Sequence, residues 1–424
     1  MLCAALAAVM AAGAVLTGCG SGAGEKVTTI DVVQYKPEAV KIFDEIEKKF
    51  NESHTDVKLN IESPNDAMTV LKTRFIREDY PDIIGIGGDV NYSDFVDAGI
   101  LQDMTEYPGL ANIKDSYIQT LENLEYVPTE GTFGVPYVAN AAGILYNKDM
   151  FEEHGWKIPH TWDELMALCE EIRGEGVLPF YFGFKDTWTT LAPWNALAVE
   201  LAPSDTCAQV NEGKTTFTKE YRDVAEKMKA LLPYGEEGPI AYGYNDACTA
   251  FAHGESAMYT IGSYAIPQIL SVNPDMNIDS FVMPGGDTED TNVLNSGVDL
   301  QFCITKDCNN TEAAYEVLDF LLDKDNLQSY LDAQNAVPCE KGDFTLSSNL
   351  DGMKNYIDAD RTADFQDHHY PSEMSVDGII QSFLIDGDTD AFLARFDKNW
   401  QRYNRDIIRK VQEYKAKNGE DDRS

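Results

Sequence analysis

The feature that most constrains this chain is a regular alternation of strand-like and helix-like segments that begins at Val27. Apolar residues 29–33 are typical of a buried strand, and residues 40–50 carry apolar side chains at helical spacing. Residues 57–61 and 81–87 predict two further strands. Because strands that alternate with helices form parallel layers, we predict an α/β fold.

Polar side chains follow two of these predicted strands. Gln34 and Tyr35 come directly after the first strand, and Asp89 follows the third. In open α/β sheets, ligands bind beyond the carboxyl ends of the strands. We therefore expect these three residues to point at a common crevice.

The chain has 424 residues, more than one hydrophobic core usually supports, so two lobes are expected. A second region with its own strands and helices covers residues 141–282, and the sequence MPGG at 283–286 marks a break after it. Residues 296–304 then predict a strand, 311–322 a helix and 379–414 a mostly helical tail.

An uncharged apolar run at residues 2–16 precedes this body and stops at the tetrapeptide LTGC, residues 16–19. The run is short for a membrane span of about 20 residues. The tetrapeptide resembles the bacterial lipoprotein signal, which is cut before a cysteine that carries diacylglycerol. The resemblance implies a signal peptide over 1–18, lipidation of Cys19 and a flexible linker over 19–26. No Lys or Arg precedes the run, so we expect the true start to lie upstream.

The composition of the chain limits the classes of partner that it can bind. The formal net charge of -39 argues against nucleic acid, because neutralising phosphates needs clustered cations. No later apolar stretch is long enough to span a membrane, so we expect the body to lie on the extracytoplasmic face of the cell membrane, held by its lipid.

The cysteines and histidines of the chain allow more than one interpretation. Outside the first 19 residues the cysteines are widely spaced, which suits either disulfides or small buried side chains. No His stands beside a Cys at zinc-ligand spacing, so we predict no metal site. The pair His368 and His369 could lie at the surface or face a ligand.

Three blocks resemble one family. Residues 134–151, GVPYVANAAGILYNKDMF, are followed by IPHTWDEL at 158–165, and both resemble the first crossover of the family 1 extracellular solute-binding proteins. Residues 251–264, FAHGESAMYTIGSY, and the Ala-rich helix at 313–331 resemble two further segments of that family. Its members include maltose-binding protein and are the sugar-binding subunits of ABC importers.

The resemblance implies a type II periplasmic-binding-protein-like fold with the ligand cleft between two lobes. Lobe 1 would comprise residues 27–138 plus 285–325, and lobe 2 residues 142–282 plus 330–424. The chain would cross between the lobes at 138–142, near 283–284 and around 326–330. The implied protein is a monomer without catalytic activity or cofactor that captures a carbohydrate and delivers it to ABC permease subunits.

A sugar cleft needs aromatic rings for stacking and polar side chains for the hydroxyls. Trp188 and Trp194 lie in a turn-rich segment after a predicted strand at 180–184, and Asp299 follows small residues at a strand. The ligand-binding candidates from all these arguments are Gln34, Tyr35, Asp89, Tyr137, Trp188, Trp194, Gly262, Ser263, Tyr264, Asp299 and Tyr370.

Other functions remain open at this point. The same fold could bind a polyamine, iron or glycerol phosphate, although the chain has no adjacent tyrosines for iron and few cations for a phosphate ester. A secreted glycoside hydrolase would need a pair of carboxylates that we cannot single out. An adhesin or a sensor-associated binding protein would differ only in its partner.

Overall fold

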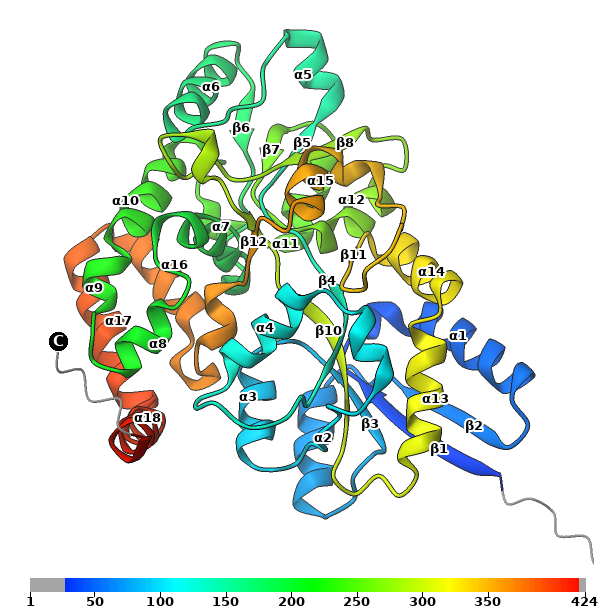
Figure 1. Cartoon of the computed structure of the whole chain (residues 1–424). Coiled ribbons are helices and arrows are strands. Elements are labelled where there is room, and N and C mark those ends of the chain that lie inside the picture. The colour runs from blue at the N-terminus through cyan, green and yellow to red at the C-terminus, as the bar shows by residue number, and fades with distance from the viewer. Residues whose placement is uncertain (1–26, 419–424) are drawn as a thin grey trace, which may run out of the picture.

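The structure is a computed structural model that describes residues 27–418. It confirms the prediction of a two-lobed α/β fold, with one main sheet in each lobe (Figure 1). A two-stranded pair of β9 (Leu294–Asn295) and β12 (Thr362–Ala363) lies between them. The predicted signal peptide, Cys19 and the linker lie outside the described residues.

The sheet of lobe 1 has six strands in the order β11-β4-β10-β3-β1-β2. Both β2 and β3 pair parallel with β1, so that Val32 lies opposite Ile61 on one side and Ile83 on the other. In contrast, β10 is inserted antiparallel between β3 and β4. The strands are β1 (Thr28–Gln34), β2 (Val57–Glu62), β3 (Ile83–Ile86), β4 (Val135–Ala139), β10 (Val298–Ile304) and β11 (Val337–Pro338).

The sheet of lobe 2 has four strands in the order β6-β7-β5-β8. They are β5 (Ile144–Asn147), β6 (Leu178–Phe180), β7 (Ser256–Tyr259) and β8 (Ile278–Phe281). The strand predicted at 180–184 ends at Phe180. The reason is that the backbone N–H groups of Phe182 and Gly183 donate to the buried Glu236 carboxylate, at 2.8 and 2.9 Å, and not to a neighbouring strand.

Helices cover both sheets, and their apolar spacing matches what they bury. In α1, for example, Phe43, Ile46 and Phe50 face the core of lobe 1. The helices of lobe 1 are α1 (Val40–Ser53), α2 (Ala67–Ile76), α3 (Val90–Asp97), α4 (Asp115–Leu124), α13 (Thr311–Leu321) and α14 (Lys324–Gln334). The helices of lobe 2 are α5 (Lys148–His154), α6 (Trp162–Gly174), α7 (Leu191–Leu201), α8 (Thr206–Asn211), α9 (Phe217–Glu220), α10 (Arg222–Leu231), α11 (Tyr244–Ala252), α12 (Ile266–Val272), α15 (Asp351–Asp358), α16 (Val376–Asp386), α17 (Thr389–Tyr403) and α18 (Arg405–Asn418).

The chain first passes between the sheets in residues 140–143, between β4 and β5. The second passage differs from the predicted one at 283–284. The N–H groups of Gly285 and Gly286 donate to Glu200 of α7, at 2.7 and 3.1 Å, so this segment still belongs to lobe 2. The chain re-enters the sheet of lobe 1 only at β10.

The third passage also differs from the prediction. Residues 326–330 lie inside α14, where Tyr330 packs in the core of lobe 1 with its ring centroid 5.3 Å from that of Phe43. Next, β11 pairs with β4 in the sheet of lobe 1. Lobe 1 extends at least to Thr345, because Glu340 forms a β-bridge with Ile113 and the N–H of Thr345 donates to Gln328 of α14 at 2.9 Å. The passage follows it, because Gly352 already donates to Asp279 of β8 at 3.2 Å.

All six cysteines within residues 27–418 are free thiols, five of them buried and Cys308 half-buried. Of the two alternatives given above, disulfides or small buried side chains, the structure therefore favours small buried side chains. In the same part of the chain, no helix combines the length and the apolar character needed to cross a bilayer.

Two helix glycines provide a test of the packing between α15 and β8. A Cβ at Gly352 would lie 1.9 Å from the backbone oxygen of Ser280, whereas a Cβ at Gly378 in α16 would meet no atom within 4 Å. We expect Gly352→Ala to lower the free energy of unfolding by about 1–3 kcal/mol through overpacking. Gly378→Ala should leave it unchanged or raise it by up to about 1 kcal/mol, because Ala favours helix. Urea unfolding followed by circular dichroism measures both, and equal effects would contradict the packing described.

Candidate ligand-binding site

A pocket of about 1120 Å³ lies between the two lobes. Lobe 1 contributes the segment after β1, the start of α1, Asp299 of β10 and the second half of α14. Lobe 2 contributes Trp188, Tyr244 and the segment from Tyr264 into α12. The pocket brings together three of the residues predicted from sequence: Trp188, Tyr264 and Asp299.

An ion pair forms the lobe 1 wall. Lys36 follows β1 and is buried, and its Nζ lies 2.6 Å from Oδ2 of Asp299 and 3.1 Å from Oε1 of Glu38. Burial alone would lower the pKa of Lys36, but Asp299, Tyr35 and Glu38 together outweigh burial and hold that pKa above its ordinary value. The Tyr35 hydroxyl donates to the backbone oxygen of Asp299 at 2.5 Å. Lys36 is therefore a charged group of the pocket that the sequence analysis did not identify.

The remaining lobe 1 candidates lie beside this pocket and not on its lining. Gln34 is fully buried and closes the turn after β1: its Oε1 accepts the N–H of Lys36 at 2.6 Å, and its Nε2 donates to the backbone oxygen of Lys36 and to Ser63. Asp89 caps α3 by accepting the N–H of Asn91 at 2.8 Å. The structure therefore gives both residues local structural roles.

Three aromatic rings form the lobe 2 wall. Trp188 lies in the short helix η3 (Thr187–Thr190) and is 40% exposed, which is unusual for a tryptophan and leaves part of its ring open to the pocket. Its ring centroid lies 4.9 Å from that of Tyr244 and 6.2 Å from that of Tyr264. Tyr244 is missing from the sequence prediction because it begins a helix, α11, that otherwise packs into the core.

The two residues before Tyr264 hold the first passage between the lobes. Ser263 is buried, its backbone N–H donates to the oxygen of Ala141 at 2.7 Å, and its Oγ accepts the N–H of Ala141 at 3.3 Å. Gly262 forms a β-bridge with Ala142. A Cβ at Gly262 would lie 2.3 Å from the Tyr264 ring, so glycine is what lets that ring turn toward the pocket. Of the predicted Gly262-Ser263-Tyr264 group, only Tyr264 lines the pocket.

The structure does not bring Trp194, Tyr370 and Tyr137 to the pocket, which corrects the expectation for all three. Trp194 is fully buried in α7, where its Nε1 donates to the Tyr370 hydroxyl at 3.2 Å. Tyr137 is equally buried in β4, and its ring lies against Phe302 and Tyr330. Each ring is covered by the core of its own lobe, so no face remains for a ligand.

A polar cluster near β12 involves the histidine pair left open above. His368 Nδ1 lies 2.8 Å from Asp364 Oδ1, and Asn195 Nδ2 donates to Asp367 at 2.8 Å. Burial would lower the pKa of His368, but the carboxylates of Asp364, Asp367 and Asp89 outweigh burial and raise that pKa to about 9. Burial instead lowers the pKa of His369. Within residues 27–418, no group of three His, Cys, Asp or Glu side chains is arranged to hold a metal ion.

The chain is similar to proteins of known family. Residues 36–328 match the model of a family described as bacterial extracellular solute-binding protein. A relative from Streptococcus mutans, named multiple sugar-binding protein, is 29% identical over 328 residues, which are 75% of this chain and 76% of the relative.

Solved structures with the same fold include two of one protein. The apo form of RafE from Streptococcus pneumoniae matches with a TM-score of 0.77 at 24% identity, covering 91% of this chain and 99% of that one. RafE in complex with raffinose matches with a TM-score of 0.76, also at 24% identity, covering 90% of this chain and 100% of that one.

The His368–Asp364 pair predicts a pH dependence of stability. The folded pKa of His368, about 9, exceeds its ordinary value of 6.5, so the stabilisation is complete below pH 6.5 and is lost as the pH rises through 9. We expect the free energy of unfolding to fall over this range more steeply in the parent than in His368→Gln.

NMR titration of the imidazole C–H signals checks the assignment directly. His368 should titrate near pH 9, while His369 stays neutral at pH 7 and serves as an internal control. Asp364→Asn should lower the His368 midpoint because it removes the nearest negative charge. A His368 midpoint below 7 in the parent would contradict the interpretation.

Proposed function

The chain belongs to the bacterial extracellular solute-binding proteins, and we propose that its solute is a sugar or oligosaccharide held between the two lobes. The observation that carries the proposal is the composition of the wide pocket. Three aromatic rings from lobe 2 face an ion pair from lobe 1 across it.

These two walls match the two kinds of surface that a sugar presents. The C–H faces of a pyranose ring are apolar and stack on aromatic rings such as that of Trp188. The hydroxyl groups need donors and acceptors, and the Lys36 ammonium and the Asp299 carboxylate supply both within 2.6 Å of each other. Because hydrogen bonds to charged groups are the stronger ones, this pair is suited to fixing hydroxyl positions.

The charges around the pocket weigh against an anionic solute. Its lining carries four carboxylates, on Glu38, Glu45, Asp299 and Asp332, and two ammonium groups, on Lys36 and Lys41. The charge of Lys36 is taken up by Asp299 and Glu38. A phosphate ester such as glycerol phosphate would therefore meet a net negative surface. The names of the Streptococcus mutans relative and of the raffinose complex also support a sugar.

We further propose that the protein is a lipid-anchored subunit of an ABC importer. The anchor would be the diacylglycerol on Cys19, which lies outside the described residues. A lipid at the N-terminus would keep the binding lobes near the permease without taking part in ligand contacts. The ABC permease pair is the partner that such a binding protein would deliver its sugar to.

Calorimetric titration of the purified full-length chain with mono- and oligosaccharides, spermidine and glycerol 3-phosphate tests the solute. We expect Trp188→Ala to weaken binding of the sugar that binds the parent by about tenfold, or about 1.5 kcal/mol, because a stacking face is lost. Tyr403→Ala is the matched control, since Tyr403 is 38% exposed on α17 and does not line the pocket. Tight binding of spermidine and of no sugar would overturn the proposal.

The anchor has its own test. Cys19→Ala should abolish incorporation of a labelled fatty acid and release the protein from the membrane, with sugar affinity unchanged. Metabolic labelling and fractionation measure the first two effects, and calorimetry measures the third. Ser21→Ala is the control, because Ser21 lies two residues after Cys19. Continued incorporation of the fatty acid into the Cys19 variant would exclude this residue as the anchor.

A further inference from the structure

The wide pocket extends beyond the ion pair and the three rings that form its walls. Its lobe 1 side follows one face of the short helix η1 (Pro37–Ala39) and of α1, with the spacing i, i+3, i+4 and i+7. The residues on this face are Glu38, Lys41, Ile42 and Glu45. With a rise of about 1.5 Å per residue, Glu45 lies about 10 Å from Glu38 along the helix. Because Glu38 pairs with Lys36, the pocket reaches about 10 Å beyond that ion pair.

A single sugar ring is too small to contact both ends of this pocket. The bonds of a pyranose ring are about 1.5 Å long, so its opposite hydroxyl oxygens lie only about 5.5 Å apart. Pockets for drug-sized ligands usually measure about 300–1,000 Å³. The volume of the wide pocket, about 1120 Å³, exceeds that range. A sugar that contacts both ends must therefore have more than one unit.

Two side-chain amides without protein partners line the part of the pocket beyond the rings. Gln268 of α12 follows Tyr264 by four residues, which is about one helical turn. Gln334 is the last residue of α14 in lobe 1. Both residues are half-buried, and within residues 27–418 neither side-chain amide forms a hydrogen bond. Neither amide has a fully buried nitrogen or oxygen atom, so a ligand in the pocket can reach both of them.

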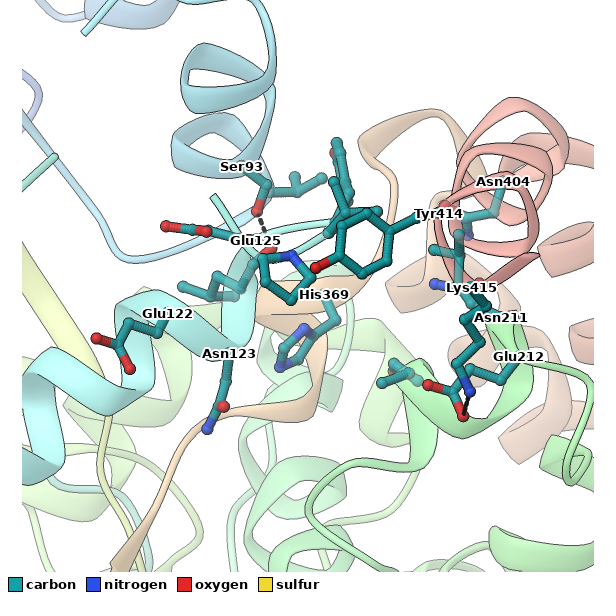
Figure 2. Close-up of a pocket in the computed structure, with 18 of the residues that line it drawn as sticks. Ser93, Glu122, Asn123, Glu125, Asn211, Glu212, His369, Asn404, Tyr414 and Lys415 are labelled. Atoms are coloured by element: carbon teal, nitrogen blue, oxygen red, sulfur yellow. Dashed lines mark hydrogen bonds and ion pairs between the residues drawn. The ribbon is translucent and has the colours of Figure 1, made fainter. Parts of the chain in front are cut away.

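A smaller pocket between the lobes, of about 290 Å³, differs in this respect. Its lining includes Lys415 of α18, which pairs with Glu212 at 2.8 Å (Figure 2). On the opposite side lies Asn123 of α4, whose amide oxygen accepts a hydrogen bond from Gln119 at 3.2 Å. This pocket shares no lining residue with the wide pocket, so its residues can serve as controls.

We propose that the wide pocket binds an oligosaccharide of at least two units. The inner unit lies between the ion pair and the three rings, and the outer unit lies between Gln268 and Gln334. A side-chain amide presents one acceptor oxygen and two donor hydrogens, which suits neighbouring hydroxyl groups that both donate and accept. Because the two amides belong to different lobes, the outer unit contacts both lobes. This inference rests on the proposed sugar function and adds to it the chain length and the residues that select it.

Calorimetry of the full-length chain with two nested series of sugars measures the effect of chain length. One series is galactose, melibiose and raffinose, and the other is glucose, maltose and maltotriose. In the series that binds, we expect the trisaccharide to bind at least ~10-fold more tightly than the monosaccharide, because only the longer chain reaches the amides. Equal Kd values along the series would overturn this inference and leave the proposed sugar function intact. Binding of no sugar in either series would overturn both.

Variants locate the outer unit. Gln268→Ala and Gln334→Ala should each weaken trisaccharide binding by ~5-fold, the effect of one lost hydrogen bond, and change monosaccharide binding by less than ~2-fold. In contrast, Trp188→Ala should weaken binding of both sugars, because its ring contacts the inner unit. Circular dichroism checks that each variant is folded.

Asn123→Ala is the matched control, since it removes an amide from the smaller pocket between the lobes and should leave the Kd of every sugar unchanged. Trisaccharide binding as tight in both glutamine variants as in the parent would overturn the assignment of the outer unit. A loss of trisaccharide affinity in the Asn123 variant alone would place the outer unit in the smaller pocket and overturn the assignment as well.

Discussion

The arrangement of the two lobes depends on backbone hydrogen bonds that join the first two passages between them to each other and to the segment that contains β12. Ala142 donates to Asn295 at 2.8 Å, Leu294 donates to Arg361 at 3.0 Å, and Ser296 donates to Ala363 at 2.9 Å. Segments from three distant parts of the chain thus hold one another, with Ser263 fastening the first of them to lobe 2. The wide pocket adjoins this junction through Tyr264, which follows Ser263, and the His368 cluster adjoins it through Asp364, which follows Ala363.

The Lys36–Asp299 pair plays the corresponding role inside the wide pocket. It joins the segment after β1 to β10, two parts of the sheet that are separated by β3. Removing Asp299 would leave the buried Lys36 ammonium with the largely exposed Glu38 carboxylate as its one ion-pair partner, which is unfavourable. The pair therefore fixes the lobe 1 wall before any ligand binds. The three rings of lobe 2 form apolar contacts, which depend less on the direction of approach than hydrogen bonds do.

The strands and helices could be predicted where their hydrophobic pattern is local. The helix expected at 311–322 is α13 (Thr311–Leu321), and the strand expected at 81–87 contains β3. The residues that line the pocket were harder to predict from the sequence, as the two tryptophans show. Trp188 and Trp194 share one short segment, yet one lines the pocket and the other is buried, because α7 is apolar on all sides and only tertiary packing decides what it covers. Lys36 was not predicted for a related reason, because its burial depends on the carboxylate of Asp299, which lies 263 residues away in the sequence.

The position of β10 has a consequence for how the chain acquires its structure. This strand lies between β3 and β4, but it follows the whole central part of lobe 2 in the sequence. The N-terminal portion of the protein thus has two strands with unpaired edges until residues 298–304 become available. Contacts over such separations are slow to form, because closing a long loop costs entropy before the pairing compensates for it. Until then, the sheet of lobe 1 is incomplete and its unpaired strand edges can pair with other chains. Any factor that binds the unfinished chain must therefore prevent such pairing.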